Sequence, residues 1–267
     1  MKTARTLMDM RGRSAMITGG GGHIGSAMAE ALAELGADVA LLDVSAERAQ
    51  QVADRLKQRH GVKASAWPVD LEDEAEVRRV AAEALAHHGR LDVLIHCAAL
   101  GGTYPLKGWV TPFEEQSMDT WRKALEVNLN AAFILAQACV PALRAGGKGS
   151  IILIGSIYGM LGPDLRLYEG TPMGNPAAYA VSKGGLLQLT RWMATALAPS
   201  IRVNIISFGG IERGQPEAFQ SRYIDRTPMK RMGTEEDAKG AAVFLSSDLS
   251  AYVTGQNIVV DGGWSVW

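Results

Sequence analysis

The sequence predicts a single-domain α/β protein, residues 1–267, built on a doubly wound, seven-stranded parallel sheet. Short apolar runs alternate with longer amphipathic runs along the whole chain. The short runs are apolar on both faces, which is typical of parallel strands covered by helices on each side. With 47% hydrophobic residues, the chain can bury a sizeable core, and no linker or internal repeat divides it.

The elements of the first half alternate regularly. Each apolar run has the length of a strand, and each amphipathic run has the length and polar face of a helix. Ser45 can cap the second helix by accepting a hydrogen bond from its first turn. We expect strands at 14–19, 38–44, 62–70 and 91–99, and helices at 24–36, 45–61 and 72–89.

The second half has longer helices and longer connections. Its expected elements are helices over 118–146 and around "YAVSK" at 179–183, and strands at 149–156, 201–207 and 257–261. Loops at strand carboxyl ends line the ligand crevice of an open α/β sheet. Such loops are expected at 100–117, at 157–176 as a substrate loop, and at 208–233 as a mobile lid.

The composition narrows the classes of partner. With 27 basic and 28 acidic residues the net charge is −1, so nothing favours nucleic acid. Cys97 and Cys139 lie in apolar runs without zinc-site spacing, which predicts buried thiols and no metal site. The N-terminus lacks a signal-peptide core, and no apolar run approaches the roughly 18 residues of a membrane span. We expect a cytoplasmic protein without a membrane partner.

A glycine-rich turn, "ITGGGGHIGSAMAEAL", joins the first strand to the first helix. Its glycines allow a tight turn and close approach of a ligand, and the helix N-terminus behind them suits a pyrophosphate. A flexible turn is the alternative, but strand, glycines and helix in this order are typical of Rossmann-type dinucleotide binding. Contacts are predicted for Gly19, Gly21, Gly22, His23, Ile24 and Gly25.

Asp43 ends the second strand, where a carboxylate can accept hydrogen bonds from the adenosine ribose hydroxyls. The same charge would repel a 2′-phosphate, and no Arg or Lys stands in the glycine turn or directly after Asp43. NAD(H) is therefore predicted over NADP(H), although Asp43 could instead be a helix N-terminal acid. Asp70 is expected to face the adenine, with a solvated loop acid as the alternative, and Val44 and Leu71 are also predicted to contact the cofactor.

Four motifs occur in one order: "TGGGGHIG" at 18–25, "VNLN" with Asn128, "IGSIYG" with Ser156, and "YAVSK" at 179–183. In this combination the chain resembles the short-chain dehydrogenase/reductase family over nearly its whole length. The resemblance implies a nicotinamide cofactor and a catalytic tetrad of Asn128, Ser156, Tyr179 and Lys183. It also implies cofactor contacts at Cys97, Ala98, Ala99, Phe208, Gly209 and Ile211.

The chemistry of hydride transfer explains the pair in "YAVSK". A proton must leave or reach the substrate oxygen, and a free tyrosine with a pKa of about 10 is a poor base near neutrality. An ammonium four residues along the same helix face favours the phenolate, so Lys183 is expected to lower the pKa of Tyr179. The resemblance implies that Lys183 also holds the nicotinamide ribose, that Ser156 orients the substrate oxygen, and that Asn128 ties a water to the lysine.

The chain departs from the family pattern at four places. His23 replaces a glycine of the turn, and "HCAA" at 96–99 replaces Asn-Asn-Ala-Gly. Phe208 replaces a proline, and Arg213 replaces a threonine near the nicotinamide carboxamide. The loop at 157–176 is about twice the usual length. We expect cofactor binding to survive these changes, because Gly19 and Gly25 remain.

The long loop carries polar groups that suit a hydroxylated substrate, and its predicted substrate contacts are Tyr158, Tyr168, Glu169 and Thr171. A surface or oligomer-contact insertion is the alternative. The loop and "FGGI" also resemble a bacterial subgroup linked to flagellin or surface-glycan modification. A substrate derived from a carbohydrate is therefore expected.

Taken together, the residues predict an NAD(H)-dependent oxidoreductase acting on a secondary alcohol or ketone. One alternative is a 3-oxoacyl reductase, which would favour NADP(H). The other is a non-catalytic dinucleotide-binding sensor or scaffold, for which a damaged tetrad would be expected. The resemblance further implies a homo-oligomer, a tetramer or dimer, and the C-terminal Trp264 and Trp267 are expected to pack against a neighbouring subunit.

Overall fold

A computed structural model of the chain describes residues 1–102 and 105–267. Its centre is one seven-stranded, all-parallel sheet in the order β3-β2-β1-β4-β5-β6-β7, which confirms the predicted fold class. The strand order reverses between β1 and β4, and such a switch point opens a ligand crevice. The strands are β1 (Ser14–Thr18), β2 (Asp38–Asp43), β3 (Ala64–Pro68), β4 (Val93–His96), β5 (Gly149–Ser156), β6 (Ile201–Phe208) and β7 (Asn257–Val260).

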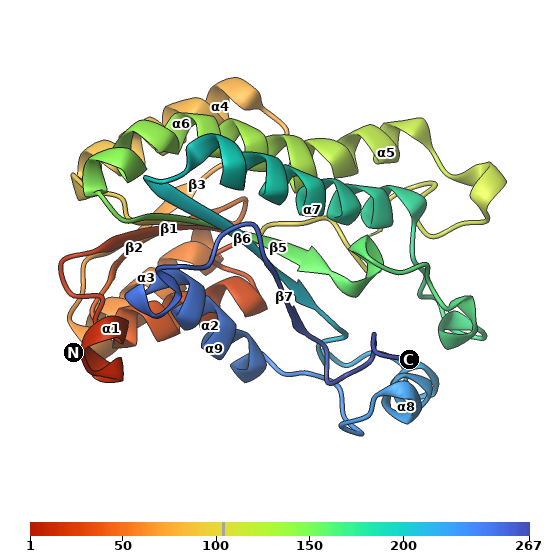
Figure 1. Ribbon diagram of the computed structural model, residues 1–267. Helices are drawn as coiled ribbons and strands as arrows, with labels where there is room; N and C mark the ends of the chain where they lie inside the picture. The colour runs from red at the N-terminus through yellow and green to blue at the C-terminus, as the bar shows by residue number, and fades with distance from the viewer. Residues whose placement is uncertain (103–104) are drawn as a thin grey trace.

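Helices cover both faces of the sheet, so the fold has three layers (Figure 1). One layer contains α4 (Glu74–His88), α5 (Met118–Leu125), α6 (Ala131–Gly146) and α7 (Ala177–Leu197). The other contains α1 (Ala4–Met8), α2 (His23–Glu34), α3 (Ala46–His60) and α9 (Glu236–Ser246). Each layer buries its own hydrophobic cluster against the sheet, because the strands are apolar on both faces.

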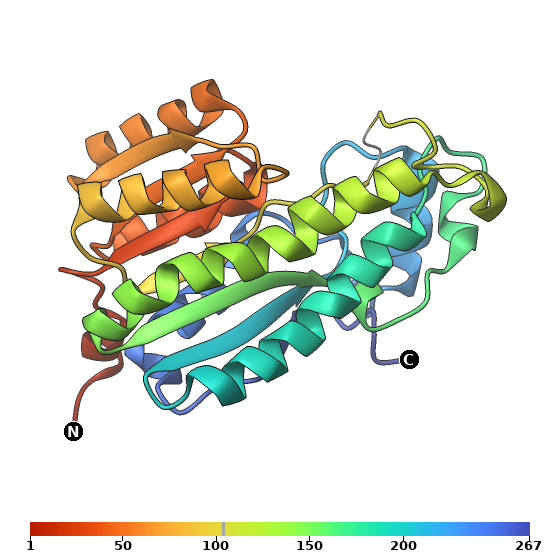
Figure 2. The ribbon, with the colours of Figure 1, turned by 90° about the horizontal axis from the view of Figure 1, so that it is seen from above.

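The helix predicted over 118–146 is continuous but contains a π-helical turn, η2 (Glu126–Asn130), between α5 and α6. It runs beside α7 across the sheet (Figure 2). By length and hydropathy this helix could cross a membrane, which the sequence analysis did not expect. A core helix of a globular domain meets the same criteria, and here Ile134, Leu135 and Leu143 are buried in the cluster against the sheet.

The three long connections lie at the carboxyl ends of the strands. The first contains η1 (Phe113–Glu115), and its residues 103–104 lie outside the described part of the chain. The second contains η3 (Ile157–Gly159) and η4 (Leu165–Tyr168), and the third contains α8 (Glu217–Arg226). In Figure 1 the carboxyl ends of β5 and β6 point toward α8 and the C-terminus. Motion of 208–233 as a lid stays a prediction.

The C-terminal tryptophans differ from each other. Trp264 is buried within its own chain, in a cluster with Tyr223 and Phe219 of α8, so the prediction that it packs against a neighbouring subunit is wrong. The physical reason is that α8 lies across the C-terminal turn and supplies the apolar cover. Trp267 is 72% exposed, and its indole N–H donates to the carbonyl of Arg226.

A remaining short helix, η5 (Asp248–Ser250), precedes β7.

Candidate active site

The glycine turn folds as a tight cradle in front of α2. Gly19 has φ +65°, a conformation that glycine adopts without strain. A Cβ on Gly25 would lie 2.1 Å from the carbonyl oxygen of Gly19, so only glycine fits there. Gly22 caps α2 without a side-chain acceptor, which leaves N–H groups of the first turn available to an anion. These features fit a dinucleotide pyrophosphate.

Asp43, at the end of β2, is hydrogen-bonded to this turn. Its carboxylate is buried and accepts hydrogen bonds from the N–H groups of Gly21 (3.0 Å) and Ser45 (2.9 Å). Arg48, on α3, lies 3.4 Å from the same carboxylate and lines the adjoining cavity. Arg48 was not among the predicted residues, because it lies five positions after Asp43 and the first turn of α3 brings its side chain back toward the carboxylate.

One cavity of about 980 Å³ runs from Asp43 to Tyr179 along the carboxyl ends of the strands. Of the residues predicted to hold the cofactor, Gly21 alone is not part of its lining, since its N–H faces Asp43. The lining contains Gly19, Gly22, His23, Ile24, Gly25, Asp43, Val44, Asp70, Leu71, Cys97, Ala98, Ala99, Tyr179, Lys183, Phe208, Gly209 and Ile211. Their roles toward a cofactor stay predictions.

The segment "HCAA" is shaped by Thr18 at the end of β1. The Thr18 hydroxyl accepts hydrogen bonds from the N–H groups of Cys97 (3.1 Å) and Ala98 (3.2 Å), and it lies 3.1 Å from Nδ1 of His96. Cys97 is only partly buried because it faces the cavity, so its predicted burial is wrong, whereas Cys139 is buried as expected. Both thiols are free.

The proposed acid/base pair lies on α7 at the inner end of the cavity. The Lys183 ammonium is 5.7 Å from the Tyr179 ring centroid and donates to the carbonyl of Ile154 at 2.8 Å. Ser156 ends β5 beside them, and its hydroxyl accepts the N–H of Tyr158 at 3.2 Å. The structure thus brings Ser156, Tyr179 and Lys183 to one wall of the cavity.

Asn128 lies behind this wall, fully buried in the π-helical turn. Its side chain accepts the Leu100 N–H at 2.7 Å and donates to the Leu100 carbonyl and the Ser182 hydroxyl, each at 3.0 Å. All of its amide groups are thereby engaged in joining the loop after β4 to α7. The π-helical turn interrupts the regular α-helical hydrogen-bonding pattern at this position, and such turns are frequent at functional sites.

The predicted substrate residues of the long loop lie outside the cavity lining. The hydroxyls of Tyr158 and Tyr168 meet at 2.7 Å, and the Thr171 hydroxyl donates to the Tyr168 carbonyl. Glu169 is exposed, and its carbonyl accepts from Arg222. From this loop, Pro172 and Met173 line the cavity instead. Substrate contact by the four predicted residues stays a prediction.

Comparison with known proteins identifies the family. A family model described as enoyl-(acyl carrier protein) reductase matches residues 21–265, and the chain aligns almost end to end with many dehydrogenases and reductases. The chain belongs to the short-chain dehydrogenase/reductase family. The predicted family is confirmed, and together with its named dehydrogenase and reductase relatives it identifies the chain as an enzyme that acts on CH–OH groups.

Three named proteins illustrate what this dehydrogenase/reductase is similar to. Sorbose reductase of Schizosaccharomyces pombe is 32% identical over 97% of this chain and 98% of its own. The 5-keto-D-gluconate 5-reductase of Escherichia coli is 33% identical over 97% and 98%. The NADPH-dependent 3-quinuclidinone reductase of Rhodotorula rubra has a TM-score of 0.88 at 31% identity, covering 100% of this chain and 96% of its own. Alcohol and ketone chemistry is common to these relatives, and the preferred nicotinamide cofactor is not decided by them.

The electrostatics of the dehydrogenase/reductase site differ from expectation at Tyr179. Burial raises the pKa of Tyr179, while a hydrogen bond from Ser156 and the charge of Arg213 act in the opposite direction. The expectation that the pKa of Tyr179 is lowered is therefore wrong, because desolvation outweighs these two effects. Burial also lowers the pKa of Lys183 to about 8, so its ammonium is charged at neutral pH.

Arg213 replaces the family threonine and lines the cavity. Its Nε lies 3.9 Å from the Glu235 carboxylate, which also lies 3.3 Å from Nδ1 of His23. His23 and Arg213, which both line the cavity, therefore lie on either side of Glu235. Two departures from the family pattern that are far apart in sequence share one acidic partner here.

Proposed function

We propose that this dehydrogenase/reductase transfers hydride between NAD(H) and a secondary alcohol or ketone derived from a carbohydrate. The observation that carries the proposal is the meeting of Ser156, Tyr179 and Lys183 on the wall of a cavity that begins at the glycine turn. The cradle at Gly25 and the uncapped start of α2 fit a dinucleotide. When bound, the nicotinamide supplies the hydride acceptor or donor.

The chain's own residues would handle the proton and the geometry. In oxidation the Tyr179 phenolate takes the hydroxyl proton of the substrate, and in reduction the Tyr179 phenol donates its proton to the carbonyl oxygen. Ser156 holds the substrate oxygen, which positions it and stabilises developing charge. Lys183 holds the nicotinamide ribose and stabilises the phenolate, and Asn128 fixes the wall through Leu100 and Ser182.

The preference for NAD(H) rests on Asp43. Its buried carboxylate would accept bonds from the ribose hydroxyls and repel a 2′-phosphate. Arg48 acts in the opposite direction, since a guanidinium 3.4 Å away could pair with that phosphate. The NADPH-dependent relative weakens the preference further. We rank Asp43 above Arg48 because Asp43 is buried and fixed by two backbone bonds, whereas Arg48 is more than half exposed.

Fluorescence titration with NADH and NADPH tests this preference in the wild type, Asp43→Ala and Arg48→Ala. We expect at least tenfold tighter NADH binding in the wild type, loss of the difference in Asp43→Ala, and a larger difference in Arg48→Ala. Equal or tighter NADPH binding by the wild type would overturn the cofactor proposal. It would also favour the acyl-reductase alternative.

The carbohydrate substrate is supported by relatives named for sorbose and 5-keto-D-gluconate. Contact with Tyr158, Tyr168, Glu169 and Thr171 belongs to this proposal. A 3-oxoacyl reductase is the second candidate, because Leu106, Val110 and Met173 make part of the lining apolar and the family model names an acyl substrate. Turnover of polyols, keto-sugars and sugar acids against 3-oxoacyl thioesters separates the two, and faster thioester reduction would overturn the carbohydrate proposal.

The location and assembly of the protein complete the proposal. We propose a cytoplasmic homo-oligomer, a dimer or tetramer, without nucleic-acid or membrane partners. Phe133 on α6 and Trp192 on α7 are exposed apolar side chains, and they support a subunit interface on this helix layer. Sedimentation at micromolar concentration tests it, and a monomer would contradict it.

A further inference from the structure

The backbone after β6 is held by a side chain from α8. The N–H of Gly210 donates to the phenolic oxygen of Tyr223 at 2.6 Å, and Tyr223 is buried. The neighbouring groups bond to backbone: the Gly209 N–H donates to Val260, and the Gly210 carbonyl accepts from Gly233. Three hydrogen bonds therefore hold this short stretch, and one of them depends on a single hydroxyl.

The two glycines fit closely against that tyrosine. A Cβ on Gly209 would lie 2.7 Å from the Tyr223 hydroxyl oxygen and 2.9 Å from Cα of Asp261. A Cβ on Gly210 would lie 2.9 Å from Cζ of the same ring and 3.0 Å from Cε of Met232. No side chain fits at either position without displacing the backbone or the ring, so the glycines and Tyr223 form one packed unit.

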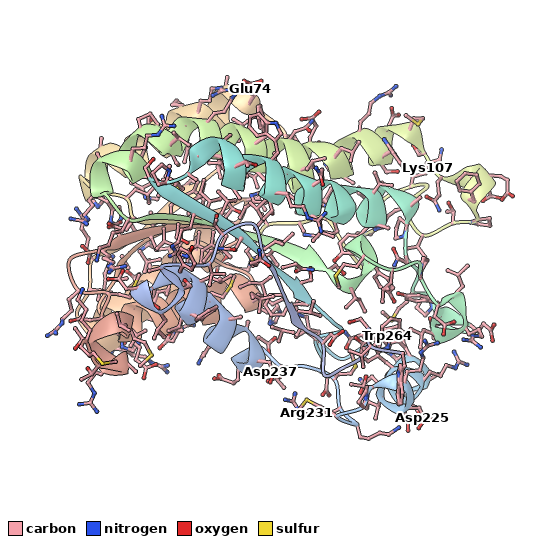
Figure 3. The ribbon with its side chains drawn as sticks, viewed as in Figure 1. Glu74, Lys107, Asp225, Arg231, Asp237 and Trp264 are labelled. Carbon is pink, nitrogen blue, oxygen red and sulfur yellow. The ribbon has the colours of Figure 1, made fainter. Side chains whose placement is uncertain are left out.

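Tyr223 is itself fixed by aromatic neighbours. Its ring stacks on Trp264 (centroids 5.7 Å apart, 16° between planes) and on Phe219 (5.9 Å, 29°). Trp264 lies beside α8 in Figure 3, in a turn closed by the Asp261 carboxylate, which accepts the N–H groups of Gly263 and Ser265. The position of the hydroxyl is thus set from both sides of the ring.

We infer that Tyr223 is a positioning residue that holds the 208–211 backbone for the nicotinamide half of the cofactor. Phe208, Gly209 and Ile211 line the cavity that Tyr179 and Lys183 line from α7. Phe208 lacks the ring by which a proline would fix φ, so beyond β6 the backbone depends on its hydrogen bonds for its position. The inference rests on the proposed function, because it assumes that a nicotinamide dinucleotide occupies this cavity.

Tyr223→Phe removes the hydroxyl and keeps the ring stacked. Binding is measured for NADH and for ADP-ribose, a fragment that lacks the nicotinamide. We expect the Kd for NADH to rise about tenfold, because the Gly210 N–H loses its partner and the backbone shifts. The Kd for ADP-ribose is expected to stay within about twofold, since the glycine turn and Asp43 lie elsewhere in the cavity.

Tyr252→Phe is the control. It also removes a tyrosine hydroxyl, but from an exposed side chain outside this aromatic cluster. We expect it to leave the affinities for NADH and ADP-ribose unchanged. Gly210→Ala, which sets a methyl group against the Tyr223 ring, is expected to reproduce the NADH-selective loss if Tyr223→Phe does not fold.

The outcomes separate this inference from the function on which it rests. Three results would overturn the positioning role alone. They are an equal rise in the Kd values for NADH and ADP-ribose, an unchanged Kd for NADH in folded Tyr223→Phe, and an unchanged Kd for NADH in Gly210→Ala. Wild-type protein that binds neither ligand would overturn the proposed function, and the positioning role with it. Melting temperatures of all variants, measured without ligand, establish that each is folded at the assay temperature.

Discussion

The two ends of the cavity are built in different ways. At the adenosine end the glycine turn, the start of α2 and Asp43 lie within 25 residues of one another. The Gly20 N–H donates to the Leu42 carbonyl, and the Gly21 N–H donates to the Asp43 carboxylate. The catalytic end draws on β5, α7, the 208–233 segment with its helix α8, and the C-terminal turn. Its contacts join residues as far apart as Tyr158 and Trp264, through edge-to-face and stacked rings and single side-chain bonds. Local backbone geometry therefore determines the first end, and long-range packing determines the second.

This difference separates two functions that substitutions can affect independently. A change at the adenosine end should weaken every dinucleotide fragment that carries the pyrophosphate. A change at the catalytic end should spare such fragments and alter turnover, nicotinamide contact or proton transfer. Three substitutions test the separation.

Tyr179→Phe is expected to have the largest effect. It removes the hydroxyl that moves the proton, so turnover in either direction should fall about 10²–10⁴-fold. The Kd for NADH should change little, because the ring remains and the adenosine end is intact. Steady-state kinetics with a ketone or alcohol found in the substrate screen measure the loss.

Tyr252→Phe, at an exposed tyrosine, is the control for Tyr179→Phe and should keep wild-type kinetics. Turnover in Tyr179→Phe within a few-fold of wild type would remove Tyr179 from the proposed mechanism. Loss of NADH binding together with turnover would show that the two ends are not separable.

Gly25→Ala tests the adenosine end. The new methyl group would meet the Gly19 carbonyl oxygen at 2.1 Å, so the turn must open. We expect NADH and ADP-ribose to weaken together, by at least about tenfold, because both use the same N–H groups at the start of α2. Isothermal titration with each ligand measures the two affinities.

Gly240→Ala provides the control for this substitution, since a Cβ there meets no atom within 4 Å and lies in α9. It should leave both affinities unchanged and slightly stabilise the helix. Selective loss of NADH in Gly25→Ala, with ADP-ribose unaffected, would contradict the assignment of the glycine turn to the pyrophosphate.

The same difference explains how much could be predicted from the sequence. The parallel sheet, the glycine turn and the position of "YAVSK" follow from periodicity and from motifs whose parts are neighbours in the chain. Arg48 was missed although it is near Asp43, because its approach depends on the direction of the first turn of α3. Local sequence patterns therefore indicate the conformation of the backbone, but they indicate less reliably which side chains contact it.

The aromatic cluster was outside the reach of such patterns. Tyr158 and Tyr168 were predicted as substrate residues from polarity alone, and Trp264 was expected at a subunit interface. In the structure they pack with Tyr223 and Phe219. No spacing in the sequence signals these contacts, because the partners come from three separate parts of the chain: the 157–176 loop, α8 and the C-terminal turn. A polar loop residue has several possible partners, and the tertiary fold selects among them.

Arg213→Ala is expected to have the smallest effect, and it tests charge at the catalytic end. The positive charge of Arg213 favours the Tyr179 phenolate, so its removal should raise the pKa of Tyr179 further. Alcohol oxidation needs the deprotonated phenol, and its rate therefore rises with pH. In Arg213→Ala this rise should move to higher pH, and the fall of ketone reduction at alkaline pH should move the same way.

The shift should be small, because Arg213 is 39% exposed and its charge is screened by solvent and by Glu235. At pH 7 we expect oxidation to slow by about twofold. Arg213→Lys keeps the charge and should keep the wild-type profile, which distinguishes electrostatics from lost packing. A pH–rate profile of kcat/KM for all three proteins at low salt is the measurement. A shift to lower pH in Arg213→Ala, or an equal shift in Arg213→Lys, would mean that Arg213 acts on the site through its shape and its bond to Glu235 instead of through its charge on Tyr179.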